Sequence, residues 1–93
     1  MKKLEIIIES IELNNVLKRI KECKIEGFTV IKDVIGNSHS FSRMESDLTD
    51  VMKNAMIIIV DEEEKLSKLI EKVKVIIQDY SGIMFLSDVE VIN

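Results

Sequence analysis

The fold is decided by the stretch Ala55-Met56-Ile57-Ile58-Ile59-Val60, in which every side chain is apolar. A strand that is apolar on both faces is typical of the centre of a sheet, where both faces are covered. Asp61 and the three glutamates 62–64 follow directly. Asp61 can cap free N–H groups, Glu64 holds the capping-box position, and acidic residues favour the positive end of a helix dipole. The sequence therefore predicts a buried strand that leads straight into a helix.

The rest of the chain alternates between strand and helix patterns. Apolar residues recur at helical spacing in two segments, namely Leu13, Val16, Leu17, Ile20 and Cys23 or Lys24, and then Leu66, Leu69, Ile70, Val73 and Ile77. Period-2 alternation predicts further strands over 3–9, 28–35 and 83–92. The resulting βαββαβ order predicts a ferredoxin-like α+β fold, with an antiparallel sheet and both helices on one face.

The other face of this sheet is expected to be too apolar for water. Ile7, Ile31, Ile35 and part of 56–60 are expected to point away from the helices. A surface on which this many apolar side chains lie together usually marks an interaction site. We therefore expect the chain to assemble with copies of itself.

Residues 37–52 show neither strand alternation nor a continuous helical stripe. A structureless loop of this length within a compact domain is usually a binding loop, a lid or a disordered segment. Loops also carry recognition more often than the scaffold that holds them. We expect this segment, between Gly36 and Lys53, to carry function.

Composition narrows the class of protein. The 93 residues are expected to form one domain, 1–93, and 46% of them are hydrophobic, which argues against disorder. The net charge of −4 opposes general nucleic-acid binding, because no excess of lysine and arginine neutralises a phosphate backbone. A single cysteine, Cys23, and the lack of a secretory segment indicate the cytoplasm. Cys23 itself is interpreted as a small buried hydrophobe rather than a reactive thiol.

Catalytic motifs are scarce. His39 is the single histidine, so a nucleophile–histidine pair would have to use it, and we do not expect an enzyme. His39, Glu45, Asp47 and Asp50 could surround a metal ion, but their spacing matches no known pattern, and solvated loop residues are the preferred interpretation. No metal is expected.

Each of the three glycines, Gly27, Gly36 and Gly82, stands at a strand boundary. Glycine there allows either a tight turn or the close approach of a ligand to the backbone. The pattern by itself leaves both readings open.

Several segments together resemble the PII signalling superfamily over essentially the whole chain. They are residues 1–8 at the N-terminus, residues 27–30, the long loop before the apolar strand, and the βαββαβ order. The segment Asp79-Tyr80-Ser81-Gly82-Ile83-Met84-Phe85-Leu86-Ser87-Asp88-Val89-Glu90-Val91 is similar to that of SbtB-type regulators of bicarbonate transport and of carboxysome-associated PII-like proteins.

The resemblance implies a homotrimer that binds adenine nucleotides in clefts between subunits. It implies contacts from Gly27, Phe28 and Thr29, with Gly36 and Asn37 at the base of the loop closing over the ligand. Ser81 and Gly82 would come from the neighbouring subunit. Residues 37–52 would be a shortened T-loop that controls a target, such as a membrane transporter for bicarbonate. The protein would then be cytoplasmic and reach the membrane through its partner.

Departures from the family pattern affect the expected ligand. The glycine-rich, lysine-containing turn of typical PII proteins is reduced here to 79–82, so sensing of 2-oxoglutarate with ATP is not expected. The loop is net acidic, and Arg43 is its candidate phosphate contact. AMP, ADP or cyclic AMP is therefore expected rather than ATP.

Two further functions stay open. In the first, Lys53 binds bicarbonate or another small anion and the protein is an anion sensor. In the second, the protein has no ligand and only interacts with a partner protein.

Overall fold

The computed structural model describes residues 1–36 and 53–93. The elements follow the predicted order: β1 (Lys2–Glu9), the short 3-10 helix η1 (Ser10–Glu12), α1 (Leu13–Glu22), β2 (Thr29–Val34), β3 (Asn54–Asp61), α2 (Glu63–Asp79) and β4 (Gly82–Asp88). The predicted residues Asn37, Arg43, His39, Glu45, Asp47 and Asp50 lie outside the described ranges.

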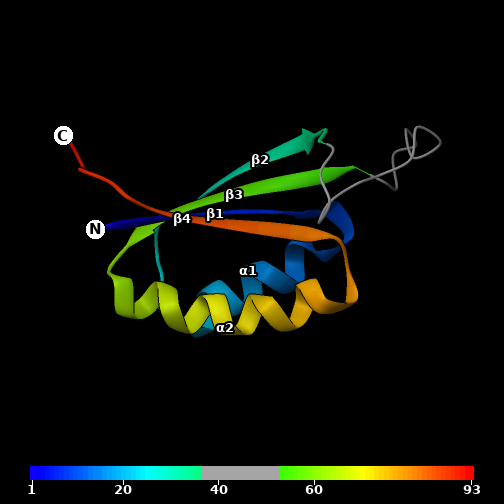
Figure 1. Ribbon diagram of the computed structural model, residues 1–93, viewed down its shortest axis with the longest axis horizontal. Coiled ribbons are helices and arrows are strands. Elements are labelled where there is room, and N and C mark those ends of the chain that lie inside the picture. The colour runs from blue at the N-terminus through cyan, green and yellow to red at the C-terminus, as the bar shows by residue number, and fades with distance from the viewer. Residues whose placement is uncertain (37–52) are drawn as a thin grey trace.

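The strands form one antiparallel sheet in the order β2-β3-β1-β4. Figure 1 shows the sheet as one layer and both helices as a second layer on one of its faces. The ferredoxin-like βαββαβ prediction is therefore confirmed. In the part of the chain that the structure describes, no helix is long and apolar enough to cross a membrane.

The core lies between these two layers. Along β1 and β3, alternate side chains are fully buried. Side chains on the inward faces of both helices are buried as well. The largest fully buried residues are Leu4, Ile6, Ile8, Ile20, Ile57, Ile59, Leu66, Leu69, Val16 and Val73. Each such side chain contributes about 1.5–3 kcal/mol of burial free energy. Both predicted helical stripes are confirmed. Ile76, which the prediction left out, is buried, while Ile77 packs half-buried at the margin of the core.

The start of α2 differs from the prediction. Asp61 is not its cap, because the β1–β3 ladder extends to the pair Lys2 and Asp61 and keeps Asp61 in the strand. The helix begins after Glu62, and within the described residues no side chain caps it there. The Asp61 carboxylate instead accepts a bond of 2.7 Å from the N–H of Glu62.

The last strand is shorter than the predicted 83–92. β4 ends at Asp88, because its ladder partner β1 has its first paired residue at Lys2, opposite Asp88. Directly after β4, the N–H of Val89 donates to the carbonyl of Met1, the residue before β1, at 3.3 Å. Val91 and Ile92 are exposed.

The sheet face opposite the helices carries a group of apolar side chains, as expected, beside the polar Lys3, Glu5, Thr29 and Ser87. The strand alternation places on it Ile7, Ile31, Met56, Ile58, Val60, Ile83 and Phe85. Ile31, Val60 and Phe85 are exposed, at 45%, 38% and 49%. We call these seven residues the open face. Ile35 does not belong to it, because β2 ends at Val34, although Ile35 is itself 83% exposed.

Candidate functional site

The structure separates the predicted nucleotide contacts into two groups at opposite ends of β2. Gly27, Phe28 and Thr29 lie where the strand begins, since Thr29 pairs with Ile58. Gly36 lies beyond the other end, where Val34 pairs with Asn54. Five residue steps of about 3.4 Å place Thr29 and Val34 roughly 17 Å apart. A single chain therefore does not bring Gly36 to Gly27.

Ser81 and Gly82 lie at the same end of the sheet as Gly36, but at its other edge. Gly82 pairs with Ile8, next to the pair of Glu9 and Asn54. Three interstrand spacings of about 4.8 Å put the ends of β2 and β4 roughly 14 Å apart. These two residues are therefore far from Gly27 of the same chain, since they lie at the other end of the sheet.

Gly27 has no structural reason to be glycine within one subunit. A Cβ atom added there would meet none of the described residues within 4 Å, and the residue does not have a positive φ. The adjacent Phe28 is 44% exposed and borders a mainly apolar groove of about 310 Å³ with Leu17, Ile20 and Ile25. An exposed ring beside an apolar groove can accept a flat aromatic group such as a base.

Gly82, in contrast, is required by packing. A Cβ atom there would lie 2.9 Å from Cγ1 of Ile77 and 3.1 Å from the backbone oxygen of Ile7. The neighbouring Ser81 N–H already donates to the carboxylate of Glu9 at 3.1 Å. Glu9 is only 8% exposed, and sequence reasoning did not single it out. A phosphate could therefore use the Ser81 N–H only by displacing Glu9.

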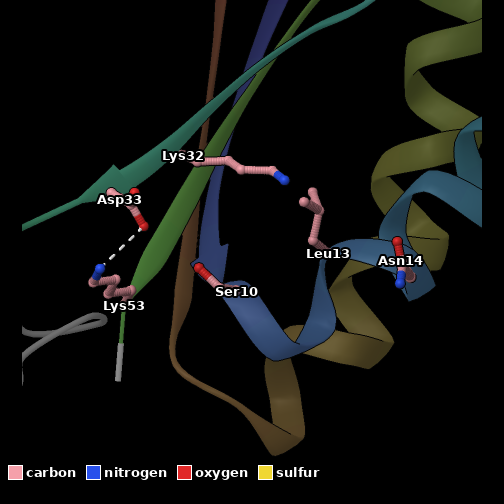
Figure 2. A pocket seen from close by; sticks show the side chains of 6 residues that line it. All are labelled: Ser10, Leu13, Asn14, Lys32, Asp33 and Lys53. Atoms are coloured by element: carbon pink, nitrogen blue, oxygen red, sulfur yellow. Dashed lines mark ion pairs between the residues drawn. The ribbon is translucent and has the colours of Figure 1, made fainter. Parts of the chain in front are cut away.

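Lys53 lies in a pocket of about 300 Å³ at the Gly36 end of β2 (Figure 2). The pocket is lined by Ser10, Leu13, Asn14, Lys32, Asp33 and Lys53. The N–H of Ser10 donates to the carbonyl of Lys53 at 2.8 Å and so joins the start of β3 to η1. The pocket therefore has one wall from the ends of β2 and β3 and another from η1 and the first turn of α1.

The charge in this pocket is mixed. Lys53 Nζ lies 3.7 Å from Oδ1 of Asp33, and Figure 2 shows Lys32 turned away from this pair, toward Leu13. The ladder of β2 and β3 shifts register between Lys32 and Val34, and Asp33, in the bulge, has a φ of +62°. This left-handed conformation is uncommon outside glycine, although aspartate and asparagine tolerate it better than most residues.

Sequence reasoning found Lys53 but missed Lys32 and Asp33. A signal was present, because Lys32 interrupts the apolar residues Val30 and Val34 at a position where the strand alternation expects an inward-facing side chain. The bulge at Asp33 carried no such signal.

Asn54 is a second feature that the sequence did not reveal. It is 3% exposed, and its Nδ2 donates to the carbonyl of Val34 at 3.4 Å. Its Oδ1 is buried, with no hydrogen-bond partner among residues 1–36 and 53–93. Asn54 thus holds the last residue of β2 to β3 at the point where the chain leaves the sheet.

The described residues contain no group of three or more histidine, cysteine, aspartate or glutamate side chains that could hold a metal ion. The four loop residues considered as metal ligands are outside the described part of the chain. The interpretation of these residues as ordinary loop residues stays a prediction.

Comparison with known proteins gives one family and several similar folds. The family model described as nitrogen regulatory protein P-II matches residues 1–93. CPII from Thiomonas intermedia K12, in a structure bound to ADP and bicarbonate, is 27% identical with a TM-score of 0.81, covering 97% of this chain and 86% of that chain. No curated protein matches the sequence.

Two further solved structures share the fold at lower identity. CPII from the same organism bound to ADP, AMP and acetate is 24% identical, with a TM-score of 0.84, covering 99% of this chain and 88% of that chain. A protein from Thermus thermophilus, described as a PII-like signalling protein, is 18% identical with a TM-score of 0.79, covering 98% of this chain and 88% of that chain.

Proposed function

The chain belongs to the nitrogen regulatory protein P-II family, and from this we propose that it is a signalling protein, not an enzyme, that binds an adenine nucleotide between copies of itself. Residues 1–93 act as one PII-like domain. Residues 37–52 report the bound ligand to a target protein.

One observation carries this proposal, namely the separation of the candidate contacts to the two ends of β2. A small nucleotide can contact Gly27 and Gly36 together only when they come from two copies. The open face supplies a reason for copies to assemble, because it presents seven apolar side chains on one side of the sheet. We propose a homotrimer in which open faces pack together.

The proposed ligand is AMP, ADP or cyclic AMP. Gly27, Phe28 and Thr29 of one subunit would receive the nucleoside. The phosphate side would contact the next subunit at Gly36, Asn37, Ser81 and Gly82. Arg43 would pair with a phosphate. Support comes from the relative from Thiomonas intermedia, whose structures are described as bound to ADP and AMP.

Calorimetric titration with AMP, ADP, ATP, cyclic AMP and cyclic di-AMP tests the proposal. We expect the first two or cyclic AMP to bind most tightly. Gly27→Val should abolish that binding while the fold is kept, because the position is open within one subunit. Tyr80→Ala, at a partly exposed residue outside the proposed site, is the control and should bind as the unchanged protein does. If none of the five nucleotides binds, nucleotide sensing is left without support.

A second candidate function is a small-anion sensor at Lys53. The pocket around Lys53 favours it, and so does the Thiomonas relative that is described as bound to bicarbonate. Bicarbonate should raise the melting temperature, and Lys53→Ala should abolish the rise. A rise of equal size from chloride at the same ionic strength would count against a specific site.

The proposed target is a membrane transporter, with bicarbonate as the expected cargo, which would bring a cytoplasmic protein to the membrane surface. Co-purification of tagged protein with one transporter, with and without the bound nucleotide, tests this step. Recovery that does not change with any nucleotide would support a ligand-free interaction module instead.

A further inference from the structure

Two lysines of the described chain lie near Gly36 and line one pocket. Lys32 is paired with Ala55, and Lys53 precedes Ala55 by two positions, directly before β3. Lys53 therefore lies near the position diagonal to Lys32 across the ladder, where residues are about 7–8 Å apart. Both lysines line the 300 Å³ pocket, and Figure 2 shows the Lys53 side chain directed toward Asp33 and the Lys32 side chain directed toward Leu13.

The pocket already holds a carboxylate from its own chain. Asp33 Oδ1 lies 3.7 Å from Lys53 Nζ. This is longer than the 2.7–2.9 Å or so of a close charge-assisted hydrogen bond. The carboxylate is also carried by a residue with a φ of +62°. Asp33 is therefore a loosely held counter-ion that an external carboxylate can replace.

The second lysine leaves one positive charge over. Within residues 1–36 and 53–93, no carboxylate forms an ion pair with Lys32. Among the described lining residues the ionised groups are two lysines and one aspartate, which favours a monoanion. Ser10 and Asn14 add a hydroxyl and an amide, which can donate hydrogen bonds to oxygen. The flexible stem of Lys32 lets its ammonium turn from Leu13 toward the same ligand.

We propose that Lys32 and Lys53 of one subunit form a site for a small carboxylate-type monoanion, and that Asp33 is the internal competitor this anion displaces from Lys53. The proposal rests on the anion-sensing function of Lys53 and adds Lys32 and Asp33 to it. Lys32, Asp33 and Lys53 of this site all belong to one subunit. Anion binding therefore releases Asp33 at the bulge where β2 ends, directly before Gly36.

The test is calorimetric titration of the full chain with sodium bicarbonate and with sodium acetate, at constant ionic strength set by sodium chloride. Lys32→Gln should weaken anion binding about tenfold, the loss expected for a contact to a charged group. Asp33→Asn should strengthen binding about fivefold by removing the competing charge, while asparagine tolerates the left-handed backbone. Lys68→Gln, at an exposed lysine of α2, removes the same charge elsewhere and should change nothing.

Unchanged affinity in Lys32→Gln, or weaker rather than stronger binding in Asp33→Asn, would overturn the proposal. Binding of both anions would assign a general carboxylate site, and binding of bicarbonate alone would assign a bicarbonate site; either outcome supports it. The same proteins are titrated with ADP. A protein that binds ADP but neither anion refutes anion sensing at Lys53 together with this inference. A protein that binds the anions with the same affinity in Lys32→Gln refutes this inference alone, and one that binds the anions but no nucleotide refutes nucleotide sensing alone.

Discussion

Alanine substitution of two glycines, Gly82 and Gly27, should change stability in opposite directions. At Gly82 the new methyl group would lie 2.9 Å from Ile77 Cγ1 and 3.1 Å from the backbone oxygen of Ile7. The Ile7 oxygen belongs to β1, which is paired on both sides, so it cannot move without distorting two ladders. Overpacking of this kind costs about 1–3 kcal/mol.

Gly27→Ala is the matched control. In the part of the chain that the structure describes, no heavy atom lies within 4 Å of the added methyl, and φ is not positive. Because alanine restricts the unfolded chain more than glycine does, the substitution should stabilise the fold by about 0.4–1 kcal/mol. The same chemical change is thus expected to destabilise at one glycine and stabilise at the other.

Thermal unfolding followed by circular dichroism measures both effects. A domain of this size shifts by roughly 4–8 °C per kcal/mol. Gly82→Ala should therefore lower the melting temperature by roughly 8–16 °C for a cost of about 2 kcal/mol. Both variants must be compared at one protein concentration, since assembly makes the melting temperature depend on concentration. A melting temperature of Gly82→Ala equal to or higher than that of Gly27→Ala would refute the packing argument.

Three further predictions concern α1, the sheet edge and the open face. Lys24 has a φ of +60°, so Lys24→Gly should raise the unfolding free energy by about 0.5–1 kcal/mol in urea titration; a loss would show that side-chain contacts outweigh backbone strain. Lys2 Nζ lies 2.6 Å from Oδ1 of Asp88. The hydrogen bond and the charge of Lys2 hold the pKa of Asp88 below its ordinary 3.8. The same contact raises the pKa of Lys2 above its ordinary 10.5. This pair should therefore stabilise the fold between pH 3.8 and pH 10.5. The stabilisation should be lost as pH falls through the lowered pKa of Asp88, and also as pH rises through the raised pKa of Lys2. Carbon-13 NMR titration should show the Asp88 pKa rising in Lys2→Gln, and an unmoved pKa would exclude the pairing in solution. Ile58→Lys on the open face should shift the light-scattering mass to that of a single chain, whereas an unchanged oligomer would place the interface elsewhere.

The helices and the inner strands could be predicted because their patterns are local. The alternation of Leu4, Ile6 and Ile8, and the helical stripe of Leu66, Leu69 and Val73, each record a single buried face. The ends of elements were less predictable, because they depend on a partner strand. Asp61 carries every local sign of a helix cap, yet the pair with Lys2 keeps it in β3.

The candidate site was predictable as a set of residues but not as an arrangement. Gly27 and Gly36 both stand at strand boundaries in the sequence, and only the ladder shows that they occupy opposite ends of β2. Gly82 looked like either a turn or a ligand contact, and its distance to Ile77 gives the packing reason. Distances of this kind are set by contacts between residues far apart in the chain, which no local pattern records.

The sequence by itself determined the order of the elements, the buried face of each and the resemblance to the PII superfamily, because side-chain periodicity and motif order are properties of the chain alone. Only the tertiary structure decided which residues meet. The bulge at Asp33 and the start of β3 bring Lys32, Asp33 and Lys53 into one pocket with Ser10. The physical reason is that strand register and helix placement are fixed by the packing of the whole core, and the positions of these charges follow from that packing.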